Sequence, residues 1–229
     1  MRILAIDKYC NAASVAIVES SEIEPIAAIS RSMARGHVEA LAPMVEETAR
    51  VVAGGLGSLD RIAVTIGPGS FTGIRVGVAM ARAMGLALGI PVVGVSTLAA
   101  FAAPLLSAPR QGVIAAAIDA RHGAIYFQLF DPSGRPLGPP RCDTLRECVL
   151  GIGAGPALLS GDAATLVATE AHRSGLPYDL GAATEAPDIV AVARLGLALD
   201  PAGAPARPLY VKPPDAKPNP AEPIASAPG

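Results

Sequence analysis

The sequence predicts an α/β protein built from two related halves, of which the second is reduced. In the first half, β-prone and amphipathic segments follow the order strand, strand, strand, helix, strand, helix, strand. A similar pattern restarts after the Ala- and Pro-rich stretch 102–110. An Ile-Asp pair ends the first predicted strand of each half, at Ile6-Asp7 and at Ile118-Asp119. We therefore expect a degenerate internal duplication.

The first half begins with three β-prone runs that polar or small residues separate, as in an antiparallel meander. The runs are ILAID at 3–7, ASVAIVE at 13–19 and IEPIAAISRS at 23–32. A helix over about 37–53 follows, because apolar residues recur there every three or four positions and two glycines then stop it. We expect Pro43 to bend this helix.

The remaining segments of the first half alternate between buried strand and helix, which is typical of parallel strands joined by crossover helices. They are a strand at 61–67, a helix at 73–88 and a strand at 90–96. The second half is expected to contain strands at 113–121, 124–131, near 139–145 and at 157–162, and helices at 163–175 and 188–200.

These patterns divide the chain into a first lobe over 1–103 and a reduced second lobe over 111–211, whose last helix is able to pack back on the first lobe. Prolines and polar residues dominate the tail over 212–229. Such a composition buries too little apolar surface to order itself, so we expect the tail to be disordered.

The composition of the chain excludes some classes of function. The chain has 229 residues, a formal net charge of -2 and 51% hydrophobic residues, so it can bury a core but lacks a basic surface that would hold nucleic acid. Cys10, Cys142 and Cys148 have no CxxC spacing and indicate reduced thiols in a cytosol. The opening MRILAID reads as a strand rather than a signal peptide, and the longest apolar stretch, 76–90, contains Arg82 and falls short of a membrane span. We expect a cytoplasmic protein without membrane contact.

The segment GPGSFTG lies between a predicted strand and a predicted helix. Gly67, Gly69 and Gly73 permit positive φ and can present backbone N–H groups to an anion at the helix N-terminus. The segment matches neither GxxxxGK[ST] nor GxGxxG. The alternative, which the residues alone favour, is a structural loop in which Ser70 or Thr72 caps the helix and the glycines let strand and helix pack closely.

The helix after this loop carries two ridges. Small residues recur every four positions at Gly73, Gly77, Ala81, Gly85 and Gly89. Large apolar residues form the second ridge at Val76, Met80, Met84 and Leu88. Because the helix is apolar on nearly every side, one face must meet the sheet. The other face is covered either by the 37–53 helix or by another chain, and the sequence leaves both possibilities open.

Several segments together resemble the TsaB (YeaZ) family of bacterial tRNA threonylcarbamoyladenosine biosynthesis proteins, which is related to the M22 glycoprotease-like proteins. They are ILAID, HVEALAPMVEE, GPGSFTGIRVGVAMARAMGLALGIPVVGVSTL, AAIDARHGAIYF and PLYVK, and the resemblance covers about residues 1–211. It implies the two-lobed actin-like ATPase (ASKHA) fold with a βββαβα core in each lobe, in agreement with the paired Ile-Asp strand ends.

The resemblance implies a partner subunit rather than an enzyme with its own active site. Such a subunit pairs with the catalytic paralogue TsaD and works with the ATPase TsaE, and the complex transfers threonylcarbamoyl to N6 of an adenosine in tRNA. It further implies no cofactor, contact with tRNA only through the complex, and a homodimer in isolation. The partner surface is expected on the two helices over 37–53 and 73–88, at Val38, Leu41, Val45, Gly73, Val76, Gly77, Met80, Ala81 and Met84.

The chain departs from the family pattern at the end of its first strand. Lys8, Tyr9 and Cys10 follow Asp7, where the family has a small hydroxylated residue. We expect the lysine ammonium either to pair with Asp7 or to occupy a phosphate position, which makes nucleotide binding by this lobe less favourable.

A second departure removes a metal site. The catalytic paralogue binds metal through an HxxxH pair, and the aligned positions here are Thr97 and Phe101. Threonine is a poor ligand and phenylalanine is none, so no metal is expected there. His37, His122 and His172 also lack ligand spacing.

The runner-up function is a nucleotide-binding phosphotransferase-like enzyme of the same fold. Peptidase activity is not expected, because Ser70 lacks the GxSxG elbow of hydrolases. Asp7 and Asp119 end strands, as acid–base groups often do. Since neither a metal pair nor a nucleotide loop accompanies them, we expect both to accept backbone hydrogen bonds instead.

Overall fold

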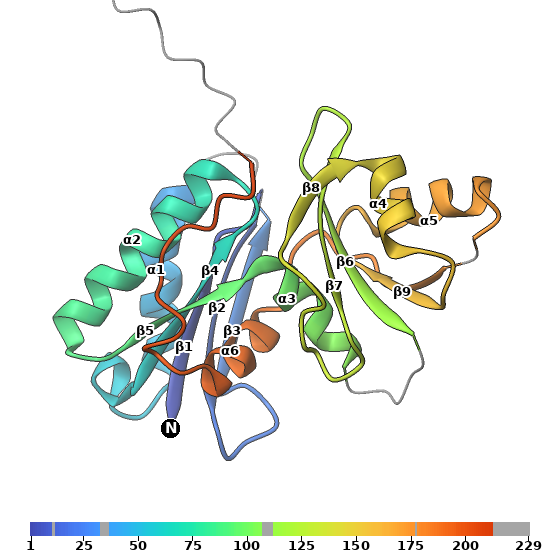
Figure 1. The fold of residues 1–229 in the computed structure, drawn as a ribbon. Helices are drawn as coiled ribbons and strands as arrows, with labels where there is room; N and C mark the ends of the chain where they lie inside the picture. The colour runs from blue at the N-terminus through green and yellow to red at the C-terminus, as the bar shows by residue number, and fades with distance from the viewer. Residues whose placement is uncertain (11, 33–36, 107–111, 177, 213–229) are drawn as a thin grey trace, which may run out of the picture.

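The computed structural model describes residues 1–10, 12–32, 37–106, 112–176 and 178–212. Two five-stranded sheets lie side by side in it, and each is covered by helices (Figure 1). The predicted tail lies outside the described residues from 213 onward.

Each half contributes the same succession of strands and helices. The elements of the first half are β1 (Arg2–Asp7), β2 (Ala12–Glu19), β3 (Ala27–Ser32), α1 (His37–Arg50), β4 (Arg61–Gly67), α2 (Phe71–Leu88), β5 (Val92–Ser96) and α3 (Thr97–Ala102). Those of the second half are β6 (Val113–Asp119), β7 (Ala124–Phe130), β8 (Arg141–Thr144), α4 (Leu145–Ile152), β9 (Ala157–Ser160), α5 (Ala164–Arg173), β10 (Asp179–Ala182) and α6 (Ile189–Ala198).

The two sheets have the same topology. Their strand orders are β3-β2-β1-β4-β5 and, written in the corresponding direction, β8-β7-β6-β9-β10. In both, the first three strands form an antiparallel meander and the fourth pairs in parallel with the first. The fold is the predicted two-lobed one, and its second lobe keeps all five strands with shorter helices: α4 has 8 residues against 14 in α1, and α5 has 10 against 18 in α2.

Three of these elements were not placed from the residues themselves: α3, α4 and β10. The helix α4 begins at a capping box, in which the Thr144 side chain accepts from the Glu147 backbone N–H and the Glu147 carboxylate accepts from the Thr144 backbone N–H. β10 has the sequence DLGA, which is poor in β-formers. At Gly181 a Cβ would lie 2.7 Å from Leu105, so close packing rather than propensity fixes this strand. β3 also starts later than predicted, at Ala27.

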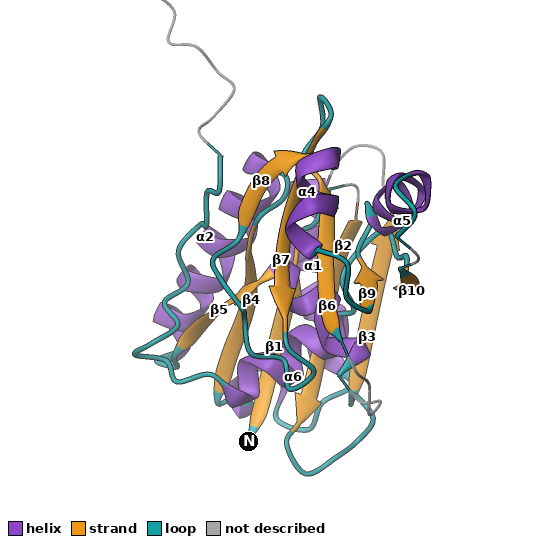
Figure 2. Cartoon of the chain, turned by 45° about the vertical axis from the view of Figure 1, so that its right-hand side comes forward, coloured by secondary structure: helices purple, strands orange, loops and turns teal. Residues whose placement is uncertain are grey.

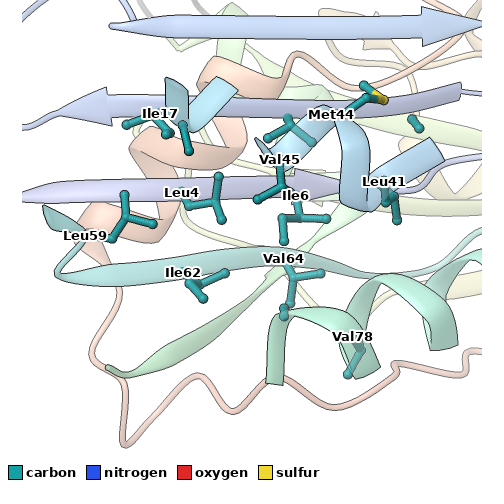
Figure 3. Close-up of a cluster of buried hydrophobic side chains, with 14 of the residues drawn as sticks. Leu4, Ile6, Ile17, Leu41, Met44, Val45, Leu59, Ile62, Val64 and Val78 are labelled. Atoms are coloured by element: carbon teal, nitrogen blue, oxygen red, sulfur yellow. The ribbon is translucent and has the colours of Figure 1, made fainter. Parts of the chain in front are cut away.

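The two faces of the first sheet bury different sets of side chains, as the alternation along a strand requires. On one face Leu4, Ile6, Ile62 and Val64 form a cluster with α1 and α2 (Figure 3). The neighbouring positions Ile3, Ala5 and Ala63 point to the other face, where they pack with α6. The first sheet is thus covered by two helices of its own half and by the last helix of the other half.

The second sheet is built in the same way. Its outer face packs against α4 and α5, and Figure 2 shows α4 lying across it. Its inner face packs against α3 through Leu98, Phe101 and Ala102. Each half therefore sends its last helix to the inner face of the other sheet: α3 contacts β6, and α6 contacts β1. Arg61 of β4 anchors α6, since its Nη1 donates to the carbonyl oxygen of Leu199 at 2.7 Å.

Residues 203–210, named the C-terminal strap below, run back along the first lobe (Figure 1). The N–H of Gly94 donates to the carbonyl oxygen of Ala204 at 2.9 Å, and the N–H of Leu209 donates to that of Ile66 at 2.8 Å. At its end Tyr210 packs on Phe71, and the Arg75 guanidinium lies over the Phe71 ring and donates to the Tyr210 hydroxyl. The strap covers the β5 edge of the sheet, an arrangement that keeps a sheet edge from pairing with other chains.

Candidate functional site

The end of β1 holds a buried carboxylate. Asp7 is 0% exposed, and its Oδ1 accepts a hydrogen bond of 2.6 Å from the Thr65 hydroxyl on β4. Among the described residues no partner reaches Oδ2. Burial raises the pKa of Asp7 to about 6, against the opposing effects of the Thr65 hydrogen bond and the Lys8 charge.

Lys8 is turned toward the backbone of the β1–β2 turn. Its Nζ donates to the carbonyl oxygens of Cys10 and Ala12, at 2.8 and 3.0 Å. Among the described residues it makes no ion pair with Asp7 within 4.0 Å, so the first of its two expected roles, direct pairing with Asp7, is wrong. The ammonium satisfies the carbonyls of the turn instead, and its charge acts on Asp7 only at a longer range.

The glycine-rich loop brings α2 close to this turn. The Ser70 hydroxyl accepts from the Gly73 N–H at 3.3 Å, so the cap predicted at Ser70 or Thr72 is at Ser70. Gly67 has φ 108° and Gly69 has φ 159°, so the loop uses the freedom that glycine provides. The N-terminus of α2 is therefore capped from within the chain.

Close packing at the same loop leaves little room over its backbone. A Cβ at Gly69 would lie 3.2 Å from the Tyr9 ring, and one at Gly73 would lie 2.7 Å from the carbonyl oxygen of Lys8. The Tyr9 ring and the Lys8 backbone thus pack directly against the loop.

Tyr9 extends from the first lobe to the second. Its ring meets Phe101 edge-on, with 5.4 Å between the ring centroids, and its hydroxyl donates to Asp162 Oδ2 at 2.6 Å. Asp162 follows β9, and its Oδ1 accepts from the backbone N–H of Asp119 at 2.8 Å. Burial raises the pKa of Tyr9 and also that of Asp162. Sequence reasoning singled out neither Asp162 nor this contact.

Asp119 ends β6 as Asp7 ends β1. As expected, its carboxylate accepts a backbone hydrogen bond, from the N–H of Arg121 at 2.7 Å. The turn that follows has positive φ at both Arg121 and His122, 63° and 54°. Non-glycine residues rarely adopt this conformation, and here the turn between β6 and β7 requires it.

Several predicted partner residues are buried inside the chain instead. Leu41 and Val45 of α1 belong to the core cluster under the helices, as Figure 3 shows, and Ala81 of α2 is 0% exposed. Gly73 and Gly77 are buried as well. These five residues are therefore not available to a partner, and the prediction that they form its surface is wrong.

The small-residue ridge of α2 faces the first sheet. A Cβ at Gly77 would lie 3.6 Å from Val64 Cγ2, and one at Gly85 only 2.2 Å from Val92 Cγ2. The absence of large side chains on this ridge lets the helix lie close to β4 and β5. The ridge thus serves packing within the lobe.

The outer surface of α2 nevertheless carries exposed apolar residues, together with the exposed side chains of Arg75 and Arg82. Val76, Met80 and Met84 of the prediction are half-buried along one flank of the helix. The exposed apolar residues of α2 beyond its first turn are Ala79, Ala83, Leu86 and Ala87, and Leu86 is 87% exposed. By length and composition α2 could cross a membrane, although a core helix passes the same test, and a third of its residues are buried in the lobe.

The outer surface of α1 is charged rather than apolar. Glu47 pairs with Arg31 at 2.6 Å, and Glu46 pairs with Arg50 one turn along the helix. The predicted contribution of α1 to a partner surface is therefore limited, because its apolar residues are used in the core. The side chain of Val38 lies outside the described part of the chain.

The aligned metal positions are buried in α3, where Thr97 is 1% and Phe101 2% exposed. Within the described residues no group of three or more His, Cys, Asp or Glu side chains comes together. The three cysteines are not joined by disulfides.

A pocket of about 500 Å³ lies under the C-terminal strap. Its lining is mostly aliphatic, with Ile66, Leu195, Leu199 and Leu209 among the residues around it. None of the predicted site residues lines it.

Comparisons with known proteins identify the family. The model of TsaD, tRNA N6-adenosine threonylcarbamoyltransferase, matches residues 27–172. The chain belongs to this family. Within it, the chain is similar to TsaB (YeaZ): it is 35% identical to the tRNA threonylcarbamoyladenosine biosynthesis protein TsaB of Escherichia coli over 127 residues, which are 56% of this chain and 54% of that protein. It spans about half the length of the curated TsaB relatives that it matches.

Two other comparisons cover nearly the whole chain. An uncharacterized protein of Mycobacterium tuberculosis is 33% identical over 219 residues, 94% of each chain. The structure of YeaZ from Pseudomonas aeruginosa matches with a TM-score of 0.68 and 27% identity, over 91% of this chain and 99% of that one. A polyphosphate/ATP-glucomannokinase of Arthrobacter, with a TM-score of 0.50 and 12% identity, shares the actin-like fold alone. The TsaB/YeaZ resemblance and the predicted fold are thus confirmed.

Proposed function

We propose that this chain is a non-catalytic subunit of the complex that makes threonylcarbamoyladenosine in tRNA. In this proposal it binds and activates a TsaD-like catalytic paralogue in the cytoplasm, together with a TsaE-like ATPase, and contacts tRNA only through the complex. The TsaB relatives support the process, since their names state threonylcarbamoyladenosine biosynthesis. In isolation the same surface would form a homodimer.

The observation that carries the partner role is the apolar outer face of α2. Exposed Ala79, Ala83 and Leu86 lie on the outer face of α2 beside exposed Arg82, and the opposite side of the helix packs on the first sheet. An exposed face of this kind is typical of a surface that another protein covers. The small side chains at Ala79 and Ala83 would let a partner helix approach closely.

The runner-up function, a nucleotide-dependent phosphotransferase, has less support. The α2 N-terminus is capped by Ser70, and Tyr9 and Lys8 lie against the glycine-rich loop. An isothermal titration of the purified chain with ATP separates the two functions. The partner role predicts no saturable micromolar binding, whereas an enzyme of this fold would bind ATP.

The decisive experiment places an arginine on the outer face of α2. Ala83→Arg should leave the chain folded, because the residue is exposed, but would force an unpaired guanidinium into the interface. At about 1.4 kcal/mol per tenfold change in affinity, a penalty of several kcal/mol lowers TsaD binding by at least about 100-fold.

The matched control is Ala198→Arg, at an exposed alanine on α6, which covers the opposite face of the first sheet. This variant should bind the partner as the unmodified chain does. Circular dichroism checks that both variants are folded, and co-purification with size-exclusion chromatography measures the complex. Normal binding of TsaD by a folded Ala83→Arg variant would contradict the proposed surface.

A further inference from the structure

The two lobes are joined by a polar contact as well as by the exchanged helices. Tyr9, which follows β1 of the first lobe, donates its hydroxyl proton to Asp162, which follows β9 of the second lobe, at 2.6 Å. The two residues are 153 positions apart in the chain. The phenol is 2% exposed, so water competes little for this hydrogen bond.

Other contacts also position each of the two side chains. The Tyr9 ring lies between Phe101 and the Gly69 backbone, where a Cβ would be 3.2 Å away. Asp162 is held by its other oxygen, Oδ1, which accepts from the Asp119 N–H at 2.8 Å. The hydrogen bond therefore forms with little loss of side-chain freedom. Oδ2 of Asp162 accepts from the first lobe, and Oδ1 accepts from the second.

We propose that Tyr9 and Asp162 form an interlobe latch, which ties the two lobes together and holds the Tyr9 ring on Gly69 of the glycine-rich loop. The exchanged helices α3 and α6 join the lobes through apolar packing and through hydrogen bonds to their own backbone, such as those from Ser160 to the Phe101 carbonyl and from Arg61 to the Leu199 carbonyl. The latch adds a hydrogen bond, which is directional, between the residues that follow β1 in the first lobe and β9 in the second. Its opening would withdraw the Tyr9 ring from Gly69 and uncover this part of the loop, next to the first turn of α2, where Phe71 and Thr72 are already exposed.

A double-mutant cycle tests the coupling between the two residues. Tyr9→Phe removes the donor and keeps the ring, and Asp162→Ala removes the acceptor. Asp162→Ala also removes the hydrogen bond from the Asp119 N–H. This loss occurs with or without Tyr9→Phe, so it cancels in the coupling energy. A charge-assisted hydrogen bond predicts a coupling of about tenfold or more in the unfolding equilibrium constant. Additive effects of the two substitutions would overturn the latch.

Hydrogen exchange then shows where the chain opens. Tyr9→Phe should accelerate exchange of amides in both 67–73 and 119–123, because the latch restrains both lobes. The control is Tyr178→Phe, which removes a hydroxyl that donates to the Gly153 carbonyl within the second lobe. It should leave 67–73 unchanged. Faster exchange in 67–73 for the control, or unchanged exchange there for Tyr9→Phe, contradicts the proposal.

Discussion

Replacing Asp7 by asparagine should change how stability depends on pH. Asp7 is fully buried, one of its oxygens has no partner among the described residues, and burial raises its pKa from 3.8 to about 6. Between about pH 4 and pH 6 the folded chain keeps a proton that the unfolded chain releases. Stability therefore falls as the pH rises through this window, and the loss is complete above pH 6.

The expected size follows from the two pKa values. The difference between 3.8 and about 6, at about 1.4 kcal/mol per pKa unit, corresponds to about 3 kcal/mol of destabilisation at pH 7. Asparagine has no proton to lose and keeps an oxygen for the Thr65 hydroxyl. When the pH is raised from 4 to 7, the free energy of unfolding of Asp7→Asn should therefore rise by up to about 3 kcal/mol relative to that of the unmodified chain.

Urea denaturation at pH 4, 5, 6 and 7 measures this effect. Asp162, whose pKa burial also raises, contributes in the same direction, so the variant should reduce the slope rather than abolish it. Asp119→Asn, at the corresponding but exposed end of β6, is the matched control; it should change the slope less than Asp7→Asn does, and only through Asp162, whose pKa the Asp119 charge helps to raise. If Asp7→Asn retains the full slope of the unmodified chain, the account of the buried charge is refuted.

Three further predictions concern packing and metal. Gly85→Ala should lower the free energy of unfolding by about 1–3 kcal/mol, because its Cβ would lie 2.2 Å from Val92 Cγ2. Gly77→Ala should be neutral or stabilise by up to about 1 kcal/mol, because its Cβ meets only ordinary contacts at 3.6 and 3.7 Å. Thermal melts of the two variants test this difference. Ala81→Arg should unfold the chain, since Ala81 is 0% exposed, and circular dichroism of a well-folded variant would contradict its core position. Elemental analysis of untagged protein should find no transition metal at one per chain, because Thr97 and Phe101 stand at the aligned ligand positions.

Much of the fold could be predicted because strands and long helices have strong local patterns. The runs at β1, β2, β4 and β6 are continuous apolar segments, and each was placed within one or two residues. α4 and β10 were missed because they are short and depend on the rest of the lobe. The Thr144–Glu147 capping box was a local signal for α4 that could have been used.

The candidate site was harder to predict because it depends on contacts between distant residues. A ridge of small residues such as Gly77 and Ala81 has the same sequence pattern whether it faces a sheet or a partner. Only the packing of α2 on β4 and β5 shows which face is buried. The sequence carries one signal for the Tyr9–Asp162 contact. Tyr9 follows β1, the central strand of the first sheet, and Asp162 follows β9, which has the same position in the second sheet as β4, the neighbour of β1, has in the first.

The duplication also provides an internal comparison for the surface of α2. Its counterpart in the second lobe is α5, which likewise connects the fourth and fifth strands of its sheet. The exposed side of α5 carries Thr165, Thr169, His172 and Arg173, with Leu166 as its exposed large apolar residue. The same position in the fold thus accepts a mostly polar outer face. The exposed alanines and Leu86 of α2 are therefore not a requirement of the architecture, and the partner surface proposed above would account for them.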